Sequence, residues 1–258
     1  MKTIWSAALV AALGALSGSV YVGGRAISDK ISAQTAQISA LSSKTELLLE
    51  NLRGNARPEA GHLHTDVRVS AIHSQMDQVT DPVVVVGDSI TELALLPAAI
   101  CGRPVINAGI GGLAISNYLP LVDAIFGNKR VPLIVVALGT NDSQKAYRDA
   151  APIAKRYTAL TAALTAKTDS FVYAGIPPIE KAPLSDMYFS TALADQNDSD
   201  IRKLADARSI AFIDFRAKMS GEKLTTDGVH LTADSYKPWL TAMVGTIQQK
   251  LGCNVGSK

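Results

Sequence analysis

The sequence has 258 residues, of which 47% are hydrophobic and 19% are charged, and its formal net charge is +2. This length and composition provide for one sizeable domain with appendages and a large buried core. The near-neutral charge, without any basic run, argues against a nucleic-acid partner.

An uncharged segment lies near the start of the chain. Thr3–Gly24 contains no charged residue and is flanked by Lys2 and Arg25. Its length suits a helix that crosses a bilayer and exceeds the usual core of a signal peptide, about 7–15 residues. We expect residues 1–25 to be an uncleaved signal anchor, with a cleaved signal peptide as the alternative. The protein is then membrane-anchored or exported, with the periplasmic or extracellular side favoured.

Apolar positions recur with heptad spacing after this segment. They follow one another in steps of four and three residues, with two polar interruptions: Ile27, Ile31, Gln34, Ile38, Leu41, Thr45, Leu48 and Leu52. The spacing predicts a coiled-coil-like stalk helix over residues 26–56, through which the chain forms a homo-oligomer. A single amphipathic helix that lies on the domain or on the membrane is the alternative. Residues 57–80 are interpreted as a linker with a short helix at Val67–Met76.

Strand-like and helix-like segments alternate over residues 81–258. Runs rich in β-branched residues predict strands at Val83–Val86, Val105–Ala108, Leu133–Leu138, Phe171–Ala174 and Ala211–Ile213. Helical spacing predicts helices near Ile90–Ile100, Ile115–Phe126, Ala150–Lys167, Asp195–Ala207 and Ala233–Leu251. This alternation indicates an α/β domain with a parallel sheet and right-handed crossovers.

Ser89 lies where the first predicted strand ends and a helix begins, within Val-Val-Val-Val-Gly-Asp-Ser-Ile-Thr-Glu (Val83–Glu92). Open α/β sheets bind ligands at the C-terminal ends of their strands. The N-terminus of a helix also favours an anion. Taken alone, the stretch is equally typical of a helix capped by Asp88 or Ser89.

Later segments bring more polar residues to the same edge of the sheet. Val105–Leu113 runs into a glycine-rich turn, Leu133–Asp142 ends in a polar turn, and Asp227–Leu231 is a tight turn before the last helix. Acyl transfer needs a nucleophile, a base, an orienting carboxylate and donors for an oxyanion. The residues that fill these roles are Ser89, His230, Asp227, and Gly112 with Asn141.

Four short blocks therefore occur in order: Gly87-Asp88-Ser89-Ile90, the glycine turn closing at Gly112, Gly139-Thr140-Asn141-Asp142 and Asp227-x-x-His230. They resemble the blocks of the SGNH (GDSL-type) esterases. The resemblance implies a three-layer α/β/α, flavodoxin-like fold with Ser89 as nucleophile, His230 as base and Asp227 orienting the imidazole. It also implies an oxyanion hole formed by the N–H groups of Ser89 and Gly112 and the side-chain amide of Asn141. Leu113 departs from the pattern, because many members have Asp there.

Histidine positions provide a separate test. Three of the four histidines precede the first predicted strand, namely His62, His64 and His73. A histidine base for Ser89 must therefore be His230. Asp214, in Phe-Ile-Asp-Phe, is the rival carboxylate; we rank it below Asp227 and expect a structural role for it. Turn chemistry is the leading interpretation of Asp142.

Other site types are disfavoured. The glycines at 109, 111 and 112 are too closely set for a dinucleotide fingerprint. His62 and His64 lack a third metal ligand at sensible spacing. Thr91 replaces the second glycine of the α/β-hydrolase elbow. We expect no cofactor and no metal.

The expected function is hydrolysis of a short acyl or acetyl ester through an acyl-enzyme. One alternative is an acyl or acetyl transferase, or a polysaccharide O-acetyl esterase, that uses the same site. Another is a membrane-tethered oligomeric scaffold with an idle hydrolase domain. Gly175–Thr191 is interpreted either as a substrate-side loop or lid, or as an irregular surface loop. Cys101 and Cys253 form a disulfide if the domain is exported, and stay two small apolar residues if it is not.

Overall fold

The structure is a computed structural model that describes residues 58–147, 151–221 and 223–253, together with Lys30, Gln34, Thr35, Ile38 and Thr45. The expected anchor over residues 3–24 lies outside the described residues, as does nearly all of the expected stalk. Among the described helices, none combines the length and the apolar character needed to cross a bilayer. The chain divides into two units, Met1–His62 and Leu63–Lys258. The second unit contains the α/β domain.

A sheet of six strands, in the order β2-β3-β1-β4-β5-β6, forms the centre of this domain. The strands are β1 (Val83–Gly87), β2 (Ala99–Ile100), β3 (Arg103–Gly109), β4 (Leu133–Ala137), β5 (Phe171–Ala174) and β6 (Ala211–Ile213). Only the short edge strand β2 is antiparallel to its neighbour; the other described pairs are parallel. Without β2, the order is that of the flavodoxin-like doubly wound sheet. The predicted parallel α/β sheet is therefore confirmed.

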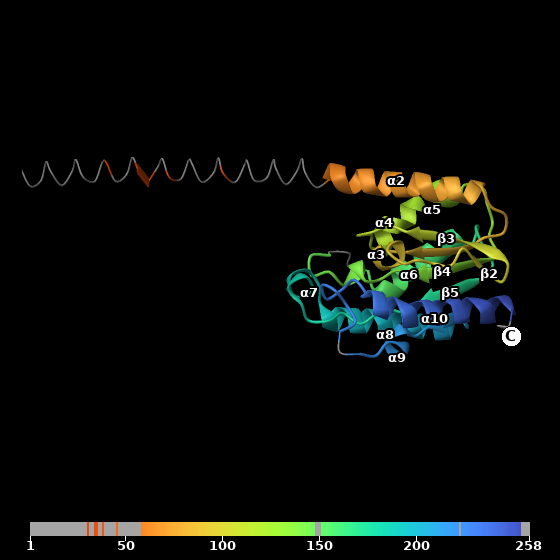
Figure 1. The fold of residues 1–258 in the computed structure, drawn as a ribbon. Helices are drawn as coiled ribbons and strands as arrows, with labels where there is room; N and C mark the ends of the chain where they lie inside the picture. Colours follow the sequence, from red (N-terminus) through yellow and green to blue (C-terminus); the bar gives the residue numbers. More distant parts are fainter. Residues whose placement is uncertain are drawn as a thin grey trace, which may run out of the picture. The chain divides into compact units, whose positions relative to one another are not determined.

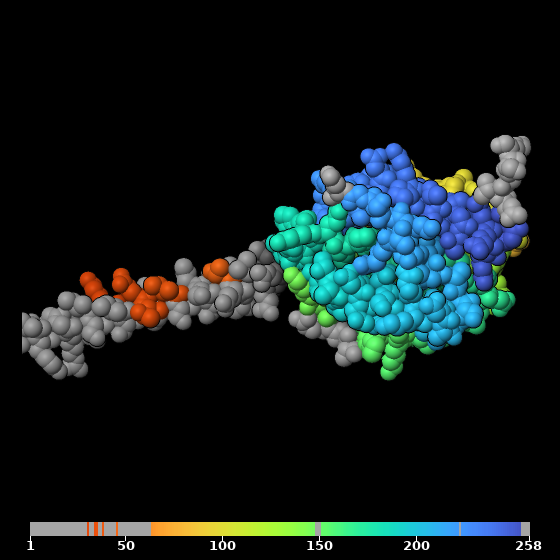
Figure 2. Space-filling model, turned by 90° about the horizontal axis from the view of Figure 1, so that it is seen from below, coloured from red at the N-terminus to blue at the C-terminus, as the bar shows by residue number. Residues whose placement is uncertain are grey.

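Helices cover both faces of the sheet. In chain order the helical elements are α2 (Pro58–Asp77), α3 (Ser89–Glu92), α4 (Ile115–Tyr118), η1 (Leu119–Leu121), α5 (Val122–Phe126), η2 (Asn141–Ser143), α6 (Ile153–Leu164), α7 (Pro183–Tyr188), α8 (Thr191–Ala207), α9 (Phe215–Lys218) and α10 (Ala233–Leu251). Figure 1 shows the sheet between α2 on one side and α10 on the other. The C-terminal residues, coloured blue, form much of the surface seen in Figure 2.

The alternation of side chains along β1 explains these layers. Val84 and Val86 belong to one hydrophobic core, which α2, α4, α5, α6 and α8 complete. Val83 and Val85 belong to a second core, to which Trp239 of α10 contributes. Successive strand residues point to opposite faces, so a valine run in a central strand is buried on both sides. All four valines are fully buried.

The first helix of the domain is shorter than predicted. The spacing predicted a helix over Ile90–Ile100, whereas α3 ends at Glu92. The Asn107 side chain donates to the carbonyl oxygens of Thr91 and Ala94, at 2.7 and 3.2 Å, and so satisfies groups that a longer helix would have used itself. Pro97 also disfavours helical geometry at the residue before it.

Other segments also differ from the prediction. The helix expected over Ile115–Phe126 is interrupted by the 3-10 turn η1, because Pro120 has no N–H to continue the hydrogen-bond ladder. Conversely, the short helix expected at Val67–Met76 extends over the whole of α2, whose Ile72 and Met76 are fully buried in the core.

A disulfide joins Cys101, in the turn between β2 and β3, to Cys253, just after α10; their Cα atoms are 6.0 Å apart. The bond closes a sequence separation of 152 residues. It fastens the last helix of the chain to the antiparallel edge of the sheet.

Candidate active site

The parallel register of three neighbouring strands assembles the site. Gly87, the last residue of β1, pairs with Gly109 of β3 and with Ala137 of β4. Ser89, Gly112 and Asn141 follow these strand ends by only a few residues. They therefore meet at the C-terminal edge of the sheet, where doubly wound folds place their ligands.

Gly87 and Gly109 permit the close approach of α3 to the strands. A Cβ atom on Gly87 would lie 2.0 Å from Thr91 Oγ1, and one on Gly109 would lie 2.3 Å from the backbone nitrogen of Glu92. Neither strand end has room for a side chain, so the serine loop and the glycine turn pack directly against each other.

A hydrogen-bonded series links Ser89, His230 and Asp227. Ser89 Oγ lies 2.9 Å from His230 Nε2, and His230 Nδ1 lies 2.7 Å from Asp227 Oδ2. The serine and histidine are 141 positions apart in the sequence. The structure therefore brings together the three residues that the sequence predicted as a triad.

The other carboxylate oxygen of Asp227 organises its own turn. Asp227 Oδ1 accepts hydrogen bonds from the backbone N–H groups of Val229 and His230, at 3.0 and 2.8 Å. Partial burial works to raise the pKa of Asp227. The hydrogen bonds from the His230 ring and from these N–H groups outweigh it and hold the pKa below its ordinary value. Asp227 is thus kept ionised beside the imidazole.

The predicted oxyanion donors line the same cleft as the serine. Its volume is about 290 Å³, and its walls are Ser89, Gly112, Asn141, Gln144, Tyr188, Phe189, Val229 and His230. Gly112 has a φ of +78°, a left-handed conformation that favours glycine. Asn141 Nδ2 donates to the carbonyl oxygen of Leu113 at 3.2 Å. This bond connects the asparagine to the glycine turn in spite of the leucine at position 113.

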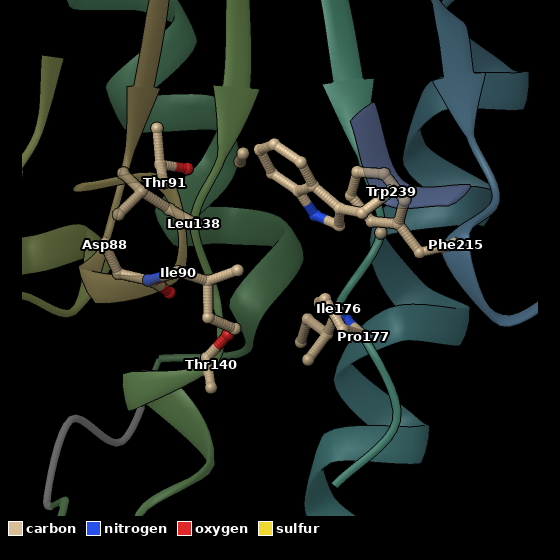
Figure 3. Close-up of a pocket in the computed structure, with 11 residues that line it drawn as sticks. Asp88, Ile90, Thr91, Leu138, Thr140, Ile176, Pro177, Phe215 and Trp239 are labelled. Carbon is tan, nitrogen blue, oxygen red and sulfur yellow. The ribbon is translucent and has the colours of Figure 1, made fainter. Parts of the chain in front are cut away.

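Asp88, next to Ser89, is a buried carboxyl. Its Oδ1 accepts from the N–H of Ile90 at 3.0 Å, so Asp88 caps α3 while Ser89 faces the cleft. Burial raises the pKa of Asp88 to about 6, although Ile90, Thr140 and His230 act in the opposite direction. Asp88 borders a small cavity of about 10 Å³. Figure 3 shows Asp88 on one side of this cavity and Trp239 on the other. From the sequence, a helix cap was the alternative to a catalytic role for this stretch. In the structure Asp88 is that cap, and Ser89 still faces the cleft.

Asp142 and Asp214 have structural partners. Asp142 Oδ1 lies 3.0 Å from Nε of the buried Arg156, and its Oδ2 accepts from the N–H of Ile115 at 3.1 Å. Asp214 caps α9 through the N–H of Ala217 and pairs with Arg202 at 2.5 Å. The contacts of Asp214 agree with the structural role expected for it. Those of Asp142 are also structural, but they join it to distant segments, whereas the sequence favoured turn chemistry.

Sequence reasoning missed Glu92, which holds the glycine turn. Glu92 Oε2 accepts from the N–H of Gly111 at 2.6 Å and lies 3.1 Å from His64 Nε2, while Oε1 lies 3.4 Å from Arg68 Nε. Arg68 also donates to the carbonyl oxygens of Asn107 and Gly109. The sequence signal that could have indicated Glu92 is its position one helical turn after Ser89. Its partners on α2 are distant in sequence, so the contacts themselves could not be predicted.

Sequence reasoning also missed Glu180, in the long segment Gly175–Thr191. Its carboxylate accepts from the N–H groups of Leu224 and Thr225, at 2.9 and 2.7 Å. Its own N–H donates to the carbonyl oxygen of Gly228 at 2.9 Å. Glu180 thereby supports the turn that carries Asp227 and His230.

No group of three or more potential metal ligands occurs in the described part of the chain.

A hydroxyl, an imidazole and a carboxylate in hydrogen-bonded series make up a site of the serine-hydrolase type. Residues 85–237 match the model of the GDSL-like lipase/acylhydrolase family. The match spans more than half of the chain, which therefore belongs to this family of enzymes. A comparison with curated proteins finds no match.

Solved structures with the same fold include several esterases. A protein described provisionally as a platelet activating factor from Streptococcus pneumonia is 20% identical, with a TM-score of 0.63 over 80% of this chain and 99% of that one. Est24, a carbohydrate acetylesterase from Sinorhizobium meliloti, is 19% identical, with a TM-score of 0.55 over 66% and 99%. The aryl esterase of M. smegmatis is 17% identical, with a TM-score of 0.55 over 66% and 100%.

The raised pKa of Asp88 predicts a pH-dependent contribution to stability. Its pKa is about 6 in the folded protein against an ordinary 3.8. Between about pH 4 and 6 the folded state therefore holds a proton that the unfolded chain has lost, so this group's contribution falls as the pH rises. A difference of about two pKa units between the folded and unfolded states corresponds to roughly 3 kcal/mol in the free energy of unfolding.

We expect Asp88→Asn to become more stable relative to wild type by up to that amount between pH 4 and pH 7. Asparagine keeps the acceptor for the N–H of Ile90. Urea unfolding of both proteins across this pH range measures the difference. A difference that does not change with pH would contradict the buried, proton-binding carboxyl.

Proposed function

We propose that the protein is a serine esterase that hydrolyses a carboxylic ester with a short acyl or acetyl group through an acyl-enzyme. The observation that carries the proposal is the series Ser89 Oγ–His230 Nε2–Asp227, with separations of 2.9 and 2.7 Å. The cleft beside Ser89 has a volume of about 290 Å³, just below the usual range for ligand sites, and is large enough for a small acyl group.

In the proposed reaction, His230 Nε2 takes the proton of Ser89 as Oγ attacks the ester carbonyl carbon. Asp227, ionised and hydrogen-bonded to Nδ1, stabilises the imidazolium and fixes the tautomer that leaves Nε2 as acceptor. The carbonyl oxygen, now negatively charged, is held by the N–H groups of Ser89 and Gly112 and by Asn141 Nδ2.

Collapse of this intermediate breaks the bond to the alcohol oxygen. The imidazolium gives its proton to that oxygen, so the alcohol leaves and the acyl group stays on Ser89. A water molecule then attacks the acyl carbon, with His230 again taking the proton. Departure of Oγ, reprotonated by His230, releases the acid and restores the free enzyme.

An acetylated carbohydrate is a second candidate substrate. The exposed ring of Tyr188, 44% accessible, borders the cleft and offers a flat apolar surface for a sugar ring. A carbohydrate acetylesterase is also among the proteins of the same fold. Comparing acetate release from acetylated oligosaccharides and from p-nitrophenyl acetate, with a labelled acetyl donor to detect transfer to sugar hydroxyls, separates these activities.

We also propose that the protein is exported or membrane-anchored through residues 1–25. The uncharged Thr3–Gly24 supports this, and so does the Cys101–Cys253 disulfide, since such bonds persist in oxidising compartments.

We expect both cysteines to resist alkylation in freshly lysed cells until a reductant is added. Deleting residues 2–25 should abolish this protection; free thiols in the full chain would contradict export.

Replacing the proposed nucleophile and replacing the proposed oxyanion donor should reduce activity to different extents. Ser89→Ala should be effectively inactive toward p-nitrophenyl acetate and should not react with a fluorophosphonate probe. Asn141→Ala should still be labelled but should lose about 10²–10³-fold in kcat, because one oxyanion donor is gone. Wild-type hydrolysis by Ser89→Ala, or probe labelling mapped to another residue, would overturn the proposal.

Asp227 and Asp214 provide a matched pair of carboxylates. Asp227→Asn should lower kcat by roughly 10²–10⁴-fold, because a neutral amide neither stabilises the imidazolium nor fixes the tautomer. Asp214→Asn should keep kcat and lose only stability, since Asp214 contacts Arg202 and α9. Steady-state kinetics and thermal melts of both variants check this. The reverse pattern would make Asp214 the orienting carboxylate.

A further inference from the structure

Gln144 contacts the proposed oxyanion donor inside the cleft. Gln144 directly follows η2, and its Nε2 donates to Asn141 Oδ1 at 2.8 Å. The residue is half-buried and lines the cleft together with Ser89 and His230. Neither the four sequence blocks nor the triad gives it a function.

The hydrogen bonds of Asn141 fix which way its amide faces. Asn141 Nδ2 lies 3.2 Å from the carbonyl oxygen of Leu113, which can only accept a hydrogen bond. Oδ1 must then face Gln144, so Gln144 must present its NH₂ group. Nδ2 has two N–H bonds. With one given to Leu113, the other is left for the oxyanion.

The backbone of Gln144 is also bonded to another segment that lines the cleft. Gln144 and Phe189 form an isolated antiparallel bridge. On either side of it, the N–H of Lys145 donates to the carbonyl oxygen of Tyr188 at 2.8 Å, and the N–H of Ser190 donates to that of Ser143 at 3.0 Å. Tyr188 and Phe189 line the cleft. The backbone of Gln144 is thus tied to the part of the wall that a substrate would touch.

We propose that Gln144 is a positioning residue that locks the Asn141 amide with its nitrogen toward the oxyanion. A side-chain amide rotated by 180° would present oxygen in place of nitrogen and would repel the developing negative charge. Donation from Gln144 to Oδ1 favours the productive orientation and polarises the amide, which makes Nδ2 a better donor. This inference rests on the proposed function, because it assigns Asn141 to the oxyanion.

Gln144→Met tests the role, since methionine has a similar length but cannot donate a hydrogen bond. We expect the full-length variant to lose about tenfold in kcat toward p-nitrophenyl acetate, with KM within about twofold of wild type, because the interaction matters in the transition state. Gln196→Met, at an exposed glutamine on α8, is the matched control and should keep wild-type kinetics.

The decisive measurement repeats Gln144→Met in the Asn141→Ala background. A residue that acts only through Asn141 has nothing left to position there, so kcat should fall by no more than about twofold further. If the full loss persists, Gln144 contacts the substrate directly and the inference is wrong. If Asn141→Ala is crippled but Gln144→Met alone is not, the inference fails while the proposed function stands. Wild-type activity of Asn141→Ala would refute the proposed oxyanion hole itself.

Gln144→Glu adds a readout that a purely structural role would not affect. An ionised carboxylate cannot donate to Asn141 Oδ1, whereas a protonated one can. The deficit relative to wild type, about 10²-fold at pH 8, should therefore shrink as the pH falls toward the pKa of the introduced glutamate. A deficit that is constant with pH would count against donation as the function of Gln144.

Discussion

The common direction and register of β1, β3 and β4 is the constraint on which the site depends. Adjacent strands lie about 4.8 Å apart, and the three run parallel, with Gly87 level with Gly109 and Ala137. The loops that follow therefore emerge side by side, and the serine loop lies between the two loops that carry Gly112 and Asn141, the proposed oxyanion donors. If one of these strands were antiparallel, its polar loop would lie at the opposite edge of the sheet. The remaining part of the candidate site is the turn Asp227–His230, which reaches the same edge of the sheet from near the end of the chain.

Carboxyl groups near the serine differ sharply in environment, and the differences separate their functions. Asp88 and Asp142 are buried, and burial raises the pKa of each. Asp88 is committed to the cap of α3, and Asp142 to Arg156. Asp227 is about a third exposed and receives several hydrogen bonds, which lower its pKa. Of these three, it is the carboxyl best suited to remain charged beside the His230 imidazole.

Features that depend on neighbouring residues could be predicted from the sequence. The valines of β1 predicted a strand buried on both faces, and Ala233–Leu251 was predicted with the bounds that α10 has. The blocks at strand ends were sufficient to nominate Ser89, His230 and Asp227, which the fold brings together; their catalytic roles remain a prediction. Pro97 was a local signal against a helix as long as Ile90–Ile100, whereas the hydrogen bonds that Asn107 supplies to the end of α3 come from another strand and could not be predicted. Glu180 and Glu92 were missed because their hydrogen bonds are tertiary and leave no periodicity in the sequence. Gln144 was missed although its partner is close, because a glutamine three residues after Asn141 forms no recognisable motif.

The segment Gly175–Thr191 was interpreted from the sequence as a lid or as an irregular surface loop. Its contacts tie it to two sides of the site. Glu180 holds the turn of Asp227 and His230, and Phe189 pairs with Gln144 beside Asn141. Surface loops normally tolerate added or deleted residues. Here a change of length between Glu180 and Phe189 would shift the turn of Asp227 and His230 relative to Asn141. Natural variation in substrate size among proteins built this way should therefore arise by replacing side chains such as Tyr188, with the spacing between these two anchor points conserved.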